Sequence, residues 1–192
     1  MAGLRVIGGE AKGRRLVAPD LPGLRPTSDR VREAVFDVLE ARGLVEGASV
    51  LDLFAGSGAL GIEAISRGAG SAVLVESDAR AARVIERNLA VLGELAGRGR
   101  VVRQEALVFL AGPGSARPQG AAGRFDVALV DPPYHFPGWD LLLGLLAPLA
   151  SVAVFEHSNR LETSPHFQVI RLYRHGGTLL TLAEAVWAGG TA

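Results

Sequence analysis

Hydrophobic and polar positions follow two alternating patterns through the middle of the chain. Short apolar runs are typical of buried strands and occur at 49–54, 71–76, 100–104, 125–130 and 151–157. Segments with apolar residues at helical spacing separate these runs, at 57–68, 78–93, 106–111 and 139–150. Strands that alternate with helices predict an α/β fold, with a mostly parallel sheet and helices on both faces.

The two ends of the chain depart from this alternation. Residues 4–19 predict two short strands around a Gly-rich turn, and the apolar spacing within 25–43 predicts a helix. Thr27 or Ser28 is placed to cap that helix. At the other end, 167–186 reads as two strands joined by Gly-Gly, which predicts a hairpin that adds an antiparallel strand.

The composition narrows the class of protein. The chain has 192 residues, 48% of them hydrophobic, which suits one domain with a small appendage. It contains no cysteine, so neither a disulfide framework nor a thiolate metal site is possible. No apolar run reaches the roughly 18 residues that a membrane span needs, and the first residues lack the apolar core of a signal peptide. We therefore expect a cytoplasmic protein with no membrane partner, and nothing indicates an obligate oligomer, so we expect a monomer.

Charge is distributed unevenly, although the formal net charge is zero. A neutral chain is unlike a protein that coats nucleic acid, but the first 32 residues hold seven basic side chains against three acids. Arg5, Lys12, Arg14 and Arg15 fall on the predicted N-terminal hairpin, and a local basic cluster steers a protein toward a polyanion. We expect these four residues to contact nucleic-acid phosphates; a solvated surface is the alternative.

A glycine-rich segment follows the first central strand. Gly56, Gly58 and Gly61 match G-x-G-x-x-G between a predicted strand and a predicted helix. Glu76 ends the next strand, where a carboxylate can hold two ribose hydroxyls. Ligands of open parallel sheets lie beyond the carboxyl ends of the strands. The combination predicts a site for a nucleoside-bearing cofactor; a tight turn followed by a capping acid is the alternative.

The identity of this cofactor depends on Asp52. An acid just before the glycine loop would repel the pyrophosphate of a dinucleotide, but it suits positive ammonium and sulfonium groups. S-adenosylmethionine carries both groups and no phosphate, so we expect it here, with Ser77 beside Glu76 at the same strand end. Glu105 and Ala106 follow the third strand and are placed to meet the adenine. A helix-start role for Glu105 is an equal alternative, because acids favour helix N-termini.

The stretch Asp131-Pro132-Pro133-Tyr134 follows the predicted strand at 125–130. Two prolines can simply end a strand, because proline cannot join the hydrogen-bond ladder of a sheet. They can also hold a carbonyl in position without a competing N–H. Asp131 and the Pro132 carbonyl would then accept the two hydrogens of an amine, and Tyr134 would offer a flat face to a nucleobase. We interpret the stretch as a catalytic clamp for an exocyclic amine, with no metal required.

In DLFAGSG at 52–58, Glu76 and DPPY at 131–134, the chain resembles class I S-adenosylmethionine-dependent methyltransferases that modify amino groups. RVIGGEAKGRRL at 5–16 and RPTSDRVREAVFDVL at 25–39 resemble the signatures of the RsmD family, bacterial enzymes that methylate N2 of one guanine in 16S ribosomal RNA. The resemblance implies a Rossmann-like, seven-stranded sheet with an antiparallel last strand, preceded by an N-terminal β-hairpin. It also implies that Phe54 lies at the cofactor.

By this resemblance, residues 1–24 are an RNA-contacting extension and residues 25–192 are the methyltransferase domain. The implied partner is 16S ribosomal RNA within a small-subunit ribonucleoprotein. An adenine-N6 methyltransferase acting on DNA or RNA is the alternative, because the DPPY motif also occurs in enzymes that methylate the N6 amine of adenine. A nicotinamide dehydrogenase would share G-x-G-x-x-G but lacks an evident hydride-transfer site. The intact DPPY argues against an RNA-binding module with an inactive cofactor pocket.

Overall fold

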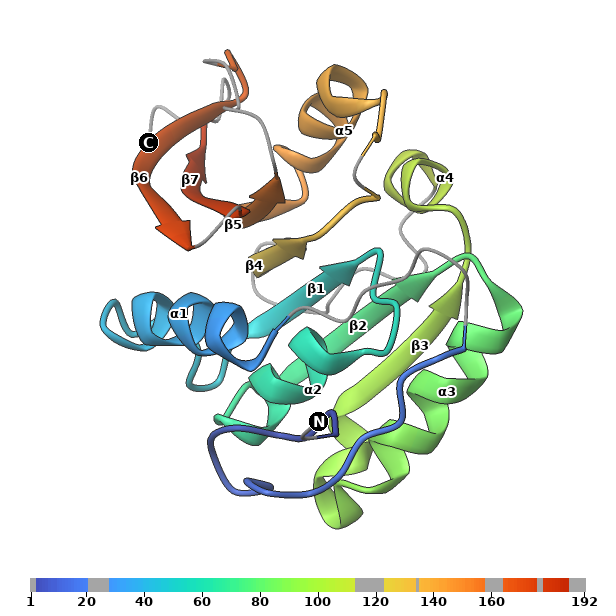
Figure 1. The fold of residues 1–192 in the computed structure, drawn as a ribbon. Helices are drawn as coiled ribbons and strands as arrows, with labels where there is room; N and C mark the ends of the chain where they lie inside the picture. The colour runs from blue at the N-terminus through green and yellow to red at the C-terminus, as the bar shows by residue number, and fades with distance from the viewer. Residues whose placement is uncertain are drawn as a thin grey trace.

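The computed structural model describes residues 3–20, 28–112, 123–133, 135–157, 164–175 and 178–186. Its centre is a seven-stranded sheet in the order β3-β2-β1-β4-β5-β7-β6 (Figure 1). The strands are β1 (Ser49–Leu53), β2 (Ser71–Glu76), β3 (Gly99–Arg103), β4 (Phe125–Val130), β5 (Ala150–His157), β6 (Phe167–His175) and β7 (Thr178–Ala185). Strands β1 to β5 are parallel, whereas β7 is antiparallel to β5 and β6. The predicted fold class, with its antiparallel last strand, is confirmed.

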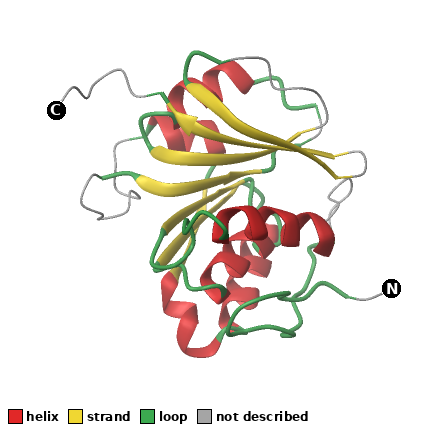
Figure 2. Cartoon of the chain, turned by 90° about the vertical axis from the view of Figure 1, so that its left-hand side faces the viewer, coloured by secondary structure: helices red, strands yellow, loops and turns green. Residues whose placement is uncertain are grey.

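Helices cover both faces of this sheet (Figure 2). One face carries α1 (Asp29–Glu40), α2 (Ala59–Ser66) and α3 (Ala79–Ala90), and the other carries α4 (Ala106–Ala111) and α5 (Trp139–Leu146). A 3-10 helix, η1 (Gly93–Arg98), follows α3 and was not predicted. The helical segments expected from apolar spacing are therefore all present, and they begin or end within a few residues of the predicted limits.

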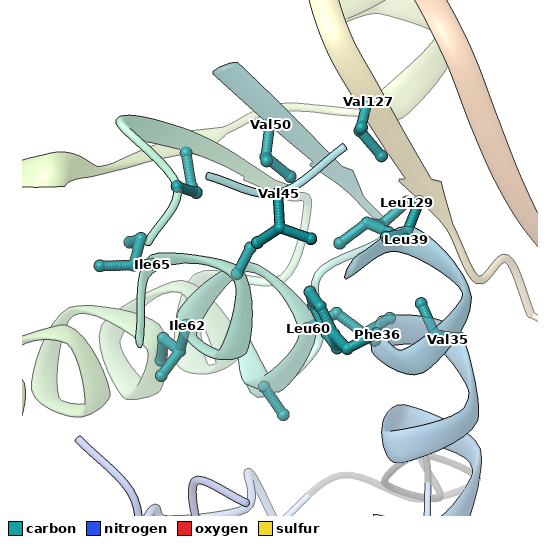
Figure 3. Close-up of a cluster of buried hydrophobic side chains, with 14 of the residues drawn as sticks. Val35, Phe36, Leu39, Val45, Val50, Leu60, Ile62, Ile65, Val127 and Leu129 are labelled. Carbon is teal, nitrogen blue, oxygen red and sulfur yellow. The ribbon is translucent and has the colours of Figure 1, made fainter. Parts of the chain in front are cut away.

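The central strands are buried on both sides, which explains their continuous apolar runs. Val127 and Leu129 of β4 belong to the core under α1 and α2, whereas Ala128 and Val130 belong to the core under α4 and α5. Successive side chains of a strand point to opposite faces. Figure 3 shows the first of these cores, where side chains of α1 and α2 gather over the strands.

Two of the helices on the first face begin at side-chain caps. The Ser28 hydroxyl accepts a hydrogen bond from the Val31 amide at 3.3 Å, and Asp78 accepts bonds from the amides of Arg80 and Ala81. Such caps satisfy amides that lack a partner within the first helical turn. Of the two predicted capping residues, Ser28 is therefore confirmed; Thr27 lies outside the described residues.

The N-terminal segment is less regular than the sequence predicts. The two expected strands are reduced to one isolated antiparallel bridge, Arg5 to Arg15, flanked by backbone hydrogen bonds from Val6 to Arg14 and from Leu16 to Leu4. In the turn between the two arms, Glu63 of α2 accepts the amides of Ile7 and Gly8 at 2.9 and 2.7 Å. The segment is thereby bound to α2.

Some predicted features fall outside the described residues. The division between an extension and a catalytic domain at residue 24 lies within 21–27, and most of the predicted loop at 112–123 lies within 113–122; neither stretch is described. The division therefore stays a prediction. In the part of the chain that is described, no helix has the length and apolar character needed to span a membrane.

Candidate active site

A row of acidic side chains follows the carboxyl edge of the sheet. Glu76, Asp52, Asp131 and Glu156 lie at or beside the ends of β2, β1, β4 and β5, which are neighbours in that order (Figure 1). The negative charges of Glu76 and Asp131 both act on Asp52, and that of Asp131 acts on Glu156. The sequence-predicted acids Asp52, Glu76 and Asp131 are therefore brought together.

The loop between β1 and α2 is held in a left-handed backbone conformation. Phe54, Gly56 and Gly58 have φ of +62°, +57° and +75°. A Cβ at Gly58 would lie only 2.9 Å from Cγ2 of Ile85, so the chain has no space there for a side chain. Positive φ is readily adopted by glycine and costs most other residues free energy. The glycine pattern is therefore required by the shape of this loop.

Gly61 serves a different purpose. A Cβ at this position would lie 2.8 Å from Cδ2 of Leu74 and 3.1 Å from Oδ2 of Asp52. The bare backbone lets α2 approach the sheet, and the Gly61 amide donates to Oδ2 of Asp52 at 2.8 Å. The third glycine of the pattern thus positions Asp52 at the start of the helix.

Asp52 is a buried acid, and burial destabilises the charged form of its carboxyl group. The residue is 1% exposed, and its pKa is raised to about 7, chiefly by burial. The hydrogen bond from Gly61 lowers this pKa, and the carboxylates of Asp131 and Glu76 contribute to raising it. A positive ligand nearby would restore the charged form, because opposite charge favours ionisation. The position suits a cation.

Glu76 is fixed at the mouth of the same loop. Its Oε2 accepts the Gly56 amide and its Oε1 accepts the Asp78 amide, both at 2.8 Å. The Ser77 hydroxyl also donates to Oε1, at 3.5 Å, whereas Oε2 keeps a further lone pair; the group can accept two ribose hydroxyls once the Ser77 hydroxyl turns away. Ser77 is exposed beside it. This is the arrangement that the sequence predicts for holding a ribose.

Glu105 and Ala106 lie at the end of β3, the next strand along this edge. Glu105 occupies the N-cap of α4, as the helix-start alternative requires, but its side chain makes no capping hydrogen bond. The Glu105 side chain is exposed and Ala106 is buried. Both interpretations of Glu105 therefore remain compatible with its position.

The stretch after β4 both turns the chain and packs against the glycine loop. Asp131 is half-buried, Pro132 is buried, Pro133 is exposed, and Tyr134 lies outside the described residues. The Pro133 carbonyl accepts the Phe136 amide at 2.9 Å, which closes a turn. The ring of Phe136 then meets Phe54 edge to face, with centroids 5.2 Å apart. The turn of the alternative interpretation is therefore present, and ring packing ties it to the glycine loop; the catalytic clamp stays a prediction.

Glu156 is an acid at this edge that the sequence analysis does not predict. This half-buried acid follows Val154 and Phe155 in β5, and it lines one small hollow together with Asp131. An acid at the end of an otherwise apolar strand indicates a residue at the carboxyl edge of the sheet, and the same pattern predicted Glu76 and Asp131. The run at 151–157 was interpreted only as a strand.

The predicted RNA-contacting residues lie elsewhere. Arg5, Lys12, Arg14 and Arg15 are all exposed on the N-terminal segment, which binds the last turn of α2, away from the row of acids (Figure 1). Arg5 pairs with Asp29 at 3.4 Å, and Arg14 donates to the Val91 carbonyl. The structure groups the four residues but does not bring them to the carboxyl edge.

Comparison with known proteins assigns a family. A family model described as "Conserved hypothetical protein 95" matches residues 4–184. The chain is 46% identical over 132 residues to "Ribosomal RNA small subunit methyltransferase D" of Escherichia coli K12, which covers 69% of this chain and 61% of that protein. The protein of the same name from Haemophilus influenzae is 39% identical over 133 residues, covering 69% and 65%. The chain thus matches less than two thirds of the length of either relative.

A solved structure is similar to this chain over a longer span. The structure of a hypothetical protein from Thermus thermophilus is 36% identical, with a TM-score of 0.75, and covers 95% of this chain and 99% of that one. The sheet order, the glycine loop and the acid-Pro-Pro segment agree with the sequence resemblance described above. We conclude that this chain belongs to the RsmD family of methyltransferases.

Proposed function

We propose that this protein transfers the methyl group of S-adenosylmethionine to the N2 amine of a guanine in 16S ribosomal RNA. The observation that carries the proposal is the adjacency of β1 and β4, which sets the glycine loop and Asp52 beside Asp131-Pro132-Pro133. The names of two relatives, as ribosomal RNA small subunit methyltransferases, support an RNA substrate.

The residues at the first half of the edge fit S-adenosylmethionine. The glycines at 56 and 58 allow close approach of the backbone, and Glu76 offers two oxygens to the ribose hydroxyls. Asp52 provides the negative charge that an ammonium and a sulfonium favour. Phe54, Ser77, Glu105 and Ala106 surround the remaining space in this proposal. When bound, the cofactor supplies an electrophilic methyl group.

The residues at the second half of the edge fit an amine. The lone pair of a nucleobase amine is delocalised, so positive charge grows on nitrogen as it attacks carbon. Asp131 and the Pro132 carbonyl each accept one N–H and stabilise that charge where it develops. Methyl transfer would form a nitrogen–carbon bond as the carbon–sulfur bond of the donor breaks, and the nitrogen would then release one proton to water. Tyr134 stacks on the base, which must leave its own stack to arrive here.

The proposal assigns RNA binding to the N-terminal segment. Arg5, Lys12, Arg14 and Arg15 would contact phosphates outside the reacting nucleotide, which positions the RNA without reading its sequence. In this proposal the substrate is 16S RNA, within a small-subunit ribonucleoprotein, and the protein acts as a cytoplasmic monomer without a metal.

Methyl transfer can be measured directly. Tritiated S-adenosylmethionine is incubated with naked 16S RNA, with small ribosomal subunits and with duplex DNA, and the labelled nucleoside is identified. We expect label in N2-methylguanosine from RNA. Label only in N6-methyladenine would show instead the alternative activity.

Asp131→Ala tests the mechanism in the same assay. We expect a loss of roughly a hundredfold or more in kcat, the scale of removing one transition-state hydrogen-bonding group. Cofactor affinity, measured by calorimetry, should change little. Asp140→Ala, at an exposed acid in the first turn of α5, is the matched control. Unchanged transfer by Asp131→Ala would refute the clamp.

A further inference from the structure

Glu156 lies beside Asp131 because of strand register. Strands β4 and β5 are parallel, and Val130 is the partner of Phe155, so the next positions along the two strands are Asp131 and Glu156. Leu129 and Val154 lie two positions before the two acids and belong to the core under α1 and α2. Because side chains two positions apart in a strand share a face, Asp131 and Glu156 lie on that same face. Neighbouring strands are about 4.8 Å apart, which lets two such carboxyl groups reach one small ligand.

The hollow that Glu156 lines with Asp131 offers Glu156 little to compensate its charge. Its other lining residues are apolar and include Val35 of α1, Leu60 of α2 and Leu180 of β7, and none of its described lining residues is basic. Burial, and secondarily the charge of Asp131, raises the pKa of Glu156 to about 8. A half-buried carboxyl group beside a second one suits a ligand with two adjacent hydrogen-bond donors.

The reacting edge of guanine has this pattern. Its N2 amine is next to N1–H, so two donors are adjacent, whereas the ring nitrogen next to the N6 amine of adenine is an acceptor. We propose that Glu156 accepts the N1–H of the target guanine while Asp131 accepts its N2–H, so that Glu156 reads the identity of the base. This inference rests on the proposed function above and adds a specificity-determining residue to it.

The test compares two bases that both carry the N2 amine. 16S RNA is ligated from pieces with either guanine or N1-methylguanine at the target position, and kcat/KM is measured for each, on naked RNA and on reconstituted small subunits. The wild-type protein should prefer guanine, because N1-methylguanine lacks the donor and places a methyl group against Glu156. In Glu156→Ala the preference for guanine should fall about fivefold or more, the scale of one lost hydrogen bond to an uncharged carboxyl oxygen.

Two further variants separate base reading from a structural role. Glu156→Gln keeps an amide oxygen that accepts N1–H, and it should retain most of the preference for guanine. Glu184→Ala, at an exposed acid on β7 near the opposite edge of the sheet, should behave as the wild type. Binding of S-adenosylhomocysteine by calorimetry verifies that each variant is folded.

The outcomes distinguish the two proposals. If the wild-type protein methylates guanine but Glu156→Ala lowers transfer to both bases by the same factor, the inference is overturned and the proposed function stands. If the wild-type protein labels no guanine in ribosomal RNA, the proposed function fails and the inference fails with it. If the preference for guanine over N1-methylguanine falls in Glu156→Ala but not in Glu156→Gln or Glu184→Ala, the result supports the proposed function and this inference.

Discussion

At the scale of single residues, two different uses of glycine shape the glycine loop. Gly58 has φ of +75° and almost no room for a Cβ, whereas Gly61 has a helical backbone and is needed because Leu74 and Asp52 are so close. Phe54 adopts φ of +62° without this freedom. A non-glycine residue in that region is strained and is often found at functional sites.

Gly58→Ala should destabilise the protein. We expect the free energy of unfolding to fall by about 2 kcal/mol or more, from the left-handed backbone together with the forced contact on Ile85. Urea denaturation measures this change. Gly97→Ala is the control, because a Cβ there meets nothing within 4 Å, and it should be neutral or slightly stabilising. Equal stabilities of the two variants would contradict the described loop geometry.

At the scale of elements, the N-terminal segment is attached to α2 by polar groups in place of a strand ladder. Glu63 is 0% exposed and accepts the amides of Ile7 and Gly8, while its charge is balanced by Arg67 at 2.8 Å. Arg32, also fully buried, donates to the Arg5 carbonyl at 2.9 Å. The basic residues of the segment are thereby held in a defined place.

Glu63→Ala should release this attachment. Removing one member of a buried ion pair costs about 3–5 kcal/mol of unfolding free energy, and we expect the lower end here because Arg67 keeps its ion pair with Glu40. Hydrogen exchange at the amides of Ile7 and Gly8 should accelerate at the same time. Glu33→Ala, at an exposed acid of α1, is the control and should change neither quantity. Unaltered exchange at both amides would show that Glu63 does not hold the segment.

At the scale of the whole molecule, four parallel strands bring their acidic ends to one edge. Two of these acids, Asp52 and Glu156, have raised pKa values, chiefly through burial. Each therefore keeps a proton in the folded state at pH values where the unfolded chain has lost it. Their contribution to stability is complete below about pH 4 and is lost as the pH rises through about 7 and about 8.

This linkage can be measured with a double variant, Asp52→Asn with Glu156→Gln. Between about pH 4 and pH 8 the wild-type free energy of unfolding should fall relative to that of the double variant, because unfolding releases protons in this range. Urea denaturation at constant ionic strength gives both curves. A difference that stays constant over the range would show that neither carboxyl group is shifted.

Much of this organisation follows from the sequence because its causes are local. The spacing of apolar residues distinguishes strands from helices. Ser28 and Asp78 cap their helices by accepting hydrogen bonds from amides two or three residues away. The shape of the glycine loop is set by the backbone angles of its own residues. The order of the chain then places Asp52, Glu76 and Asp131 at strand ends. Since parallel strands share one carboxyl edge, these three acids could be predicted to meet.

Tertiary structure alone decided the rest. The strands expected in 4–19 are reduced to a short pairing around Arg5 and Arg15, and Glu63, far along the chain, binds the turn between them. Glu156 lies beside Asp131 because of the register between β4 and β5, which no local pattern specifies. Local propensity determines which element a segment forms, whereas the packing of the whole chain determines which residues distant in sequence become partners. Both the attachment of the N-terminal segment and the pairing of Asp131 with Glu156 depend on such partners.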